Sequence, residues 1–230
     1  MILNIEKTFT EKLADSIIEY IITNNLQPGD KLPNEQILSS TLNAGRSSVR
    51  EAVKLLVSRN IVEVKQGSGT YVSDKKGIAD DPIGLTFIQD KKKLTFDLME
   101  IRFLLEPYIA SLAALNADEK DIEKITKLCN EIETAIRAGE QYKELDIAFH
   151  TAIAESTKNC IVPRLIPIIN STIGLFIDLV CPSLAEETIS SHREIAEAIA
   201  ERNPITAKDA MYLHLVYNRK RIKSLFLETN

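Results

Sequence analysis

The sequence GRSSVREAV, residues 45–53, decides how the first third of the chain folds. Its Ser48-Val49-Arg50-Glu51 segment fits a capping box, in which the serine and glutamate side chains each satisfy an unpaired backbone donor. We therefore expect a helix that begins at Ser47 or Ser48 and ends near Arg59. A helical wheel separates a basic side (Arg46, Arg50, Lys54) from an apolar one (Val49, Ala52, Leu55, Leu56), so one face can pack while the other stays in water.

The sequence on both sides of this stretch completes a recognisable order of elements. Upstream, residues 8–25 are amphipathic with a helical period, and Asn34 is suited to cap a short helix that ends near residue 42. Downstream, residues 61–72 are rich in β-branched side chains and contain two glycines, a pattern typical of a hairpin. Three helices followed by a glycine-tipped hairpin predict a winged helix-turn-helix over residues 7–74.

Composition indicates a mainly helical protein with a substantial core. The chain has 230 residues, of which 44% are apolar, and only eight glycines and eight prolines, which excludes disorder. The three cysteines show no CxxC spacing, so neither a disulfide framework nor a thiolate zinc cluster is expected. The apolar stretch 161–180 contains Arg164, Asp178 and two prolines, and the start lacks a secretion signal. We expect a cytoplasmic protein without a membrane partner.

The remainder of the chain predicts a second domain that is entirely helical. Residues 75–93 have weak periodicity and are expected to form a linker. Beyond them, helices are expected at 94–116, 118–137, 139–156, 159–180, 184–201 and 204–227. The expected fold is therefore mainly α, with an antiparallel six- or seven-helix bundle over residues 94–230.

Charge is distributed unevenly between these two parts. The chain has a net charge of −5, yet residues 1–76 contain ten basic and nine acidic residues, a balance of +1. The rest contains 18 basic and 24 acidic residues, a balance of −6. This asymmetry allows nucleic acid binding by the first part, although a basic helix side can also be a solvated face without a partner.

Three spaced segments resemble the winged helix of the GntR family of bacterial transcription regulators: LQPGDKLPNE at 26–35, GRSSVREAV at 45–53 and GSGTYV at 67–72. The resemblance implies that DNA is contacted by residues of the second and third helices and of the hairpin tip, namely Gln36, Arg46, Ser47, Ser48, Arg50, Gln66 and Gly67. Gln36 stands where the family usually has arginine, and Gly45 replaces the usual serine. Both departures affect phosphate contacts and operator preference.

The chain contains only three histidines, and all lie on helices expected in the second domain. Asp146 and His150 are four residues apart, so their side chains share one helix face and could hold one ion. His192 and His214 lie on the last two helices, and helical bundles often build metal sites from inward residues of facing helices. The same spacing would also be explained by an ion pair between Asp146 and His150, or by histidines that bind no ligand on amphipathic helices.

The same residues resemble the effector domain of the FadR branch of the GntR family, the FCD domain. That resemblance implies that Asp146, His150, His192 and His214 are ligands of a divalent transition metal, with zinc first and nickel, manganese or iron as alternatives. It also implies that Arg102, in the segment EIRFLLEP at 100–107, binds a small organic carboxylate. An Arg102–Glu106 pair on the surface is the competing interpretation.

The sequence therefore predicts a DNA-binding transcription regulator controlled by a carboxylate metabolite at a metal site. A homodimer would place two recognition helices on an inverted-repeat operator, and no catalytic residue is expected. Two alternatives remain open: a metalloenzyme acting on a small organic acid, and a regulator that senses an acyl ligand without metal.

Overall fold

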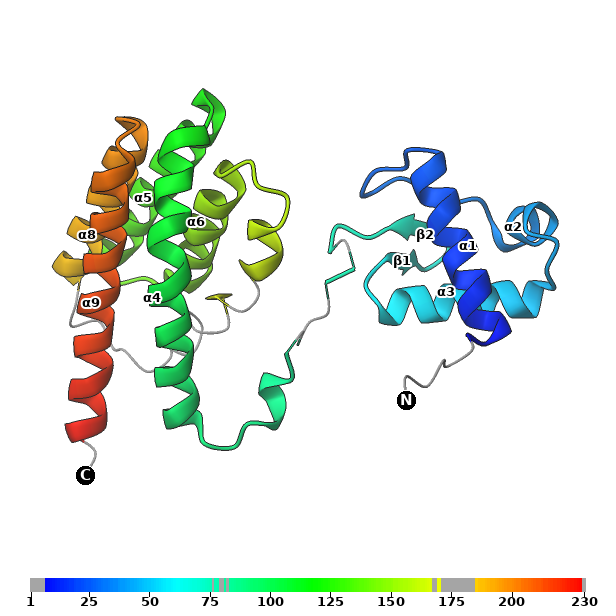
Figure 1. The fold of residues 1–230 in the computed structure, drawn as a ribbon, viewed down its shortest axis with the longest axis horizontal. Helices are drawn as coiled ribbons and strands as arrows, with labels where there is room; N and C mark the ends of the chain where they lie inside the picture. Colours follow the sequence, from blue (N-terminus) through cyan, green and yellow to red (C-terminus); the bar gives the residue numbers. More distant parts are fainter. Residues whose placement is uncertain are drawn as a thin grey trace, which may run out of the picture. The chain divides into compact units, whose positions relative to one another are not determined.

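A computed structural model describes residues 7–75, 77–78, 81, 83–166, 169–170 and 185–228 of the chain. The chain divides into two compact units, residues 1–82 and 83–230, each with its own apolar core. Both units are drawn in Figure 1. Within the described residues, no helix is both long and apolar enough to cross a membrane.

The first unit has three helices and one hairpin. Helices α1 (Phe9–Thr23), α2 (Glu35–Thr41) and α3 (Arg46–Ser58) precede strands β1 (Val62–Lys65) and β2 (Gly69–Val72), which pair antiparallel with Val62 opposite Val72. Figure 1 shows α1 lying across α3. The core draws on all three helices and the hairpin and includes Ile17, Leu38, Val49, Leu56 and Val62. The expected winged helix-turn-helix is confirmed.

The start of α3 differs from the expectation. Asn34 does cap α2, because its side chain accepts the backbone N–H of Ile37 at 2.9 Å. Helix α3, however, begins at Arg46 with Gly45 as its N-cap, and no side chain caps it. The predicted Ser48–Glu51 capping box is therefore wrong. Because the helix begins two residues before Ser48, Ser48 lies inside its first turn and is not at the N-cap position.

The hairpin is short and held at its base. Gly67 and Gly69 have φ values of 72° and 130°, which side chains with a Cβ rarely adopt, so these glycines permit the tight tip. Ser68 donates its backbone N–H to the carbonyl of Lys65 across the turn at 2.9 Å. Lys31 forms an isolated bridge with Tyr71, which ties the hairpin to the segment before α2.

The second unit is a helical bundle. Its long helices in the described residues are α4 (Lys91–Asn116), α5 (Glu119–Ala138), α6 (Lys143–Ser156), α8 (Ala185–Ala200) and α9 (Pro204–Glu228), and a 3₁₀ turn at Leu85–Phe87 precedes them. Figure 1 shows α4 and α9 side by side, with α5 and α6 behind them. Helix α4 contacts α6, α8 and α9, so side chains from four helices converge. The mainly helical fold class is confirmed.

Three boundaries differ from the expected ones. Helix α4 begins at Lys91 rather than residue 94, because Asp90 caps it by accepting the backbone N–H of Lys93. Helix α6 begins at Lys143 rather than 139, since Gly139 adopts φ 72° and ends α5 instead. Of the helix expected over 159–180, residues 162–166 and 169–170 are helical, and the remainder lies largely outside the described residues.

Candidate DNA interface and metal centre

The first two turns of α3 present an exposed basic side. Arg46, Ser47 and Arg50 are exposed and Ser48 is half-buried, whereas Val49 between them is fully buried in the core. Packing of Val49 fixes the rotation of the helix, so the two arginines point into water. Gln36 on α2 and Gln66 and Gly67 at the hairpin tip are also exposed. Every residue expected to contact DNA is therefore accessible to it.

Arg50 is not alone on this surface. Its Nε lies 3.0 Å from Glu35 Oε1 and its Nη2 lies 2.6 Å from Glu35 Oε2, a two-point pair between α3 and the first residue of α2. Hydrogen bonding to Arg50 lowers the pKa of Glu35, and the pairing raises the pKa of Arg50, so both groups carry charge at neutral pH. Sequence reasoning did not single out Glu35.

The three histidines of the chain meet in the interior of the second unit. His150 comes from α6, His192 from α8 and His214 from α9, and all are buried. One nitrogen of each lies within 4.8 Å of the others, so the three imidazoles could surround one metal ion. Residues 64 positions apart in sequence are thus brought together by helix packing.

Asp146 joins this cluster from α6. Its Oδ1 lies 3.1 Å from His192 Nε2, and it is buried like the histidines. Two ligands bound to one ion at metal–ligand distances near 2.1 Å are separated by about 3 Å, so this spacing suits shared coordination. The neighbouring His192 imidazole outweighs the effect of burial and lowers the pKa of Asp146, which keeps it a carboxylate.

Two buried nitrogens of the cluster, His150 Nε2 and His192 Nδ1, have no partner among the described residues, and His192 Nε2 has only its contact with Asp146 Oδ1. A buried polar atom without a partner is costly, and a metal ion would take the lone pair of one nitrogen on each ring. The chemistry of the set, three imidazoles and one carboxylate, suits zinc or a neighbouring transition metal. The residues therefore fit a divalent metal.

The tautomer of His150 suits metal binding, whereas both ring nitrogens of His214 contact protein side chains, one of which a metal ion would replace. Glu106 Oε2 lies 2.7 Å from His150 Nδ1, so Nδ1 carries the proton and Nε2 keeps its lone pair. Asn218 Nδ2 donates to His214 Nε2 at 3.0 Å, and Ser191 Oγ lies 3.0 Å from His214 Nδ1. Burial lowers the pKa of His214 well below its usual 6.5, so this imidazole is neutral at physiological pH.

Glu106 is a residue of this centre that sequence reasoning missed. It binds His150 on one side and Arg102 on the other, where Arg102 Nε and Nη2 each donate to its carboxylate. Both side chains are about 1–3% exposed, so the competing interpretation of a surface pair is wrong. Burial opposes ionisation of Glu106, but the charge of Arg102 and the hydrogen bonds from Arg102 and His150 hold its pKa well below the usual range.

The described residues leave little space next to the cluster. A cavity of about 10 Å³ lies between Glu106, His150 and apolar side chains of α4, α6 and α9, among them Ile109, Ile153 and Met211. That volume is close to the minimum for a single water molecule. Among the described residues, therefore, no space large enough for a small acid adjoins the cluster.

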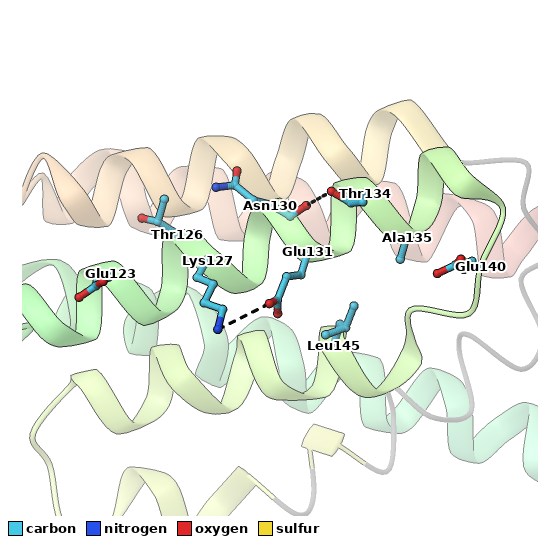
Figure 2. Close-up of a pocket in the computed structure, with 9 residues that line it drawn as sticks. All are labelled: Glu123, Thr126, Lys127, Asn130, Glu131, Thr134, Ala135, Glu140 and Leu145. Atoms are coloured by element: carbon cyan, nitrogen blue, oxygen red, sulfur yellow. Dashed lines mark hydrogen bonds and ion pairs between the residues drawn. The ribbon is translucent and has the colours of Figure 1, made fainter.

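A wider hollow lies on the surface of the second unit and does not include the histidines. It has a volume of about 630 Å³ and is lined by α5, Glu140 and Leu145. Figure 2 shows Lys127 directed toward Glu131 within it and the Thr134 hydroxyl donating to the carbonyl of Asn130. The hollow contains none of the buried residues that gather around the histidines, so the functional candidate remains the buried cluster.

An exposed basic helix in a winged domain, joined to a helical domain with a buried polar centre, defines a DNA-binding regulator of transcription. Residues 9–72 match the family described as bacterial regulatory proteins, gntR family, and residues 97–217 match the FCD domain. The chain belongs to the GntR family of transcription regulators, in the branch that carries an FCD domain.

Two named relatives and one solved structure illustrate the match. The HTH-type transcriptional regulator LutR of Bacillus subtilis (strain 168) is 32% identical, over 91% of this chain and 99% of that protein. The Uxu operon transcriptional regulator of Escherichia coli (strain K12) is 31% identical, over 92% and 86%. The solved structure of Streptococcus agalactiae GntR is 41% identical with a TM-score of 0.82, over 92% of this chain and all of that chain.

Proposed function

We propose that this regulator binds an inverted-repeat operator as a homodimer, using the exposed side of α3. Arg46 and Arg50 read bases in the major groove, while Ser47, Ser48 and Gln36 contact the backbone and Gln66 and Gly67 at the hairpin tip reach the minor groove. The exposure of both arginines above the buried Val49 carries this proposal. Two-fold symmetry would place two such helices on one face of the DNA.

The proposed division of labour follows the two units. The DNA-binding domain comprises residues 7–74. A linker of residues 75–93 connects it to residues 94–230, which bind the effector and hold the dimer together. Acting on DNA inside a bacterium, the protein would be cytoplasmic. It would work by binding rather than turnover, because an enzyme would have no use for the winged helix.

The proposed metal ligands are Asp146, His150, His192 and His214, with zinc first and nickel, manganese or iron as alternatives. The unpartnered buried nitrogens of His150 and His192 support this proposal. When bound, the ion would supply a positive charge that can attract an anionic ligand. Glu106 would orient His150, as a carboxylate commonly does for a metal-bound histidine.

The proposed effector is a small organic carboxylate that bridges the metal and Arg102. Buried Arg102, Glu106 and Asp146 together carry −1, and a divalent ion changes this to +1. A monocarboxylate would neutralise the remaining charge, which is expensive to leave alone in a buried site. Because the described residues leave little space next to the cluster, the acid must favour a rearranged bundle, and this difference in affinity would couple it to DNA binding.

The test of DNA binding starts from a pool of DNA duplexes with a randomised 26-base-pair core. Full-length protein should enrich an inverted repeat whose half-sites are about one helical turn apart. The Arg46→Ala/Arg50→Ala double variant should enrich nothing while keeping its helical circular dichroism. Equal enrichment by both proteins would contradict the assignment of α3 as the reading helix.

A further inference from the structure

Glu35 holds one edge of the Arg50 guanidinium. Nε lies 3.0 Å from Oε1 and 3.2 Å from Oε2, and Nη2 lies 2.6 Å from Oε2, so the carboxylate faces the edge formed by Nε and Nη2. A guanidinium is flat and has a second edge with two parallel N–H groups, formed by Nη1 and Nη2. That second edge is outside the pair.

Both ends of this pair are anchored by the fold. Glu35 is the first residue of α2, whose start is fixed by the Asn34 cap on Ile37. Arg50 follows Val49, which has no exposed surface and locks the rotation of α3. The carboxylate and the guanidinium therefore meet because α2 packs on α3, and the arginine is held in place before any DNA arrives.

The edge left outside the pair matches guanine. Two parallel N–H groups fit the O6 and N7 acceptors of guanine in the major groove, and no other base offers two acceptors there. Meanwhile the edge occupied by Glu35 cannot form a two-point contact with a phosphate. The carboxylate also cancels the arginine's charge, which weakens attraction to DNA of any sequence.

We propose that Glu35 is a positioning residue that presents Arg50 to a guanine and so sets base specificity at one position of the operator. The inference rests on the proposed function, since it assigns Arg50 a base contact. It predicts that Glu35 contributes to discrimination between bases more than to total affinity. A side chain that is already held in place loses less conformational entropy on binding. For one long side chain, this saving changes the affinity by about a few-fold.

The experiment uses full-length wild type and the variants Arg50→Ala, Glu35→Gln and Glu51→Gln. Glu51→Gln is the matched control: it removes a carboxylate from the same surface, but Glu51 pairs with Lys54 instead of Arg50. Selection from the randomised duplex pool first identifies the base whose preference depends on Arg50. Affinities for duplexes carrying each of the four bases at that position are then measured by fluorescence anisotropy.

Glu35→Gln should reduce the preference for guanine at that position about fivefold and leave the preferences elsewhere unchanged. Glu51→Gln should keep the full preference, while both variants bind unrelated DNA equally or slightly more tightly because each loses one negative charge. In an Arg50→Ala background, Glu35→Gln should have no further effect on discrimination.

Guanine preference within twofold of wild type in Glu35→Gln would overturn the inference while leaving α3 as the reading helix. An equal loss in Glu35→Gln and Glu51→Gln would overturn it too, since a general charge effect would then suffice. If wild type selects no sequence at all, the proposed function itself fails, and the two failures are thereby distinguished.

Discussion

Two arginine–glutamate pairs in this protein have the same hydrogen-bond pattern and opposite surroundings. In Arg50–Glu35 and in Arg102–Glu106, the arginine donates from Nε and Nη2 to both carboxylate oxygens. The side chains of the first pair are 58% and 38% exposed, and those of the second are 1% and 3% exposed. The same chemistry is therefore placed once in water and once in the core.

The surroundings decide what each pair can do. An exposed pair gains little free energy from its charges, so the arginine can meet an external polyanion such as DNA at little cost. In the buried pair each charge has lost its water, so removing either partner leaves the other without its counter-charge. The first arrangement suits recognition of a large ligand at a surface. The second suits an enclosed site for a small charged ligand.

The largest expected effect comes from breaking the buried pair. Arg102→Met should lower the free energy of unfolding by about 3–5 kcal/mol, because Glu106 loses its buried counter-charge. Arg50→Met should leave unfolding almost unchanged. Urea denaturation followed by circular dichroism measures both.

The matched control for this first variant removes both charges. Arg102→Met/Glu106→Gln should recover most of the lost stability, since no unpaired charge remains. A single Arg102→Met variant as stable as wild type would contradict the assigned burial of the pair.

Acid should destabilise the metal-free protein, and the loss should arise in the second unit. The pKa of His214 is lowered in the folded state from 6.5, so the unfolded chain takes up the proton first as pH falls. Stability should therefore decrease below about pH 6.5, by up to about 1.4 kcal/mol per pH unit for this one group.

The carboxylates act in the same direction at lower pH. Asp146 and Glu106 have lowered pKa values, so their stabilising contribution is present above their unfolded values of 3.8 and 4.5 and is lost as pH falls further. Urea titrations of chelator-treated protein between pH 7.5 and 5 measure the contribution of His214 to the free energy of unfolding. In the His214→Gln variant, this free energy should change less steeply with pH. Stability that stays flat or rises on acidification would refute the neutral, buried state of His214.

On the exposed side, Arg46→Ala should weaken binding to the selected duplex about tenfold, as expected for one lost two-point base contact. Lys7→Ala is the control, because Lys7 is an exposed cation of the same unit that pairs with Asp15 of α1. Anisotropy titrations at two salt concentrations separate base reading from phosphate attraction. An equal loss of affinity in both variants would mean that Arg46 contributes only its positive charge and makes no base contact.

The smallest effects distinguish the two helix starts beside the DNA surface. Asn34→Ala should cost about 1 kcal/mol of stability, because its side chain caps α2. Ser48→Ala should cost far less, since no serine side chain caps α3. Thermal unfolding of the two variants measures the difference, and a Ser48→Ala loss as large as that of Asn34→Ala would restore the discarded capping box.

Local patterns predicted most of the fold. The buried Val49 and the Asn34 cap depend on neighbours within a few residues, and such signals are visible in a sequence. The start of α3 was misjudged because the prediction relied on a side-chain cap, whereas Gly45 occupies the N-cap position and has no side chain to cap with. The start of α6 was misjudged because Gly139 was taken as its first residue, whereas its positive φ ends the preceding helix.

The site was predictable in part for a similar reason. Asp146 and His150 share a face of one helix, so their proximity follows from spacing. Glu106 lies 44 positions before His150 on another helix, and only packing of α4 against α6 brings them together. The i,i+4 spacing of Arg102 and Glu106 was visible, but spacing carries no information about burial, so a surface pair stayed open as a competing interpretation.

The most direct test of the account is the metal content per chain of purified protein offered zinc, nickel or manganese. Wild type should hold about one ion, and alanine at Asp146, His150, His192 or His214 should lower metal content and thermal stability together. Arg50→Ala, on the exposed surface, should retain the wild-type content. Equal metal in all six proteins, or none in wild type, would contradict a metal centre built from the three buried histidines.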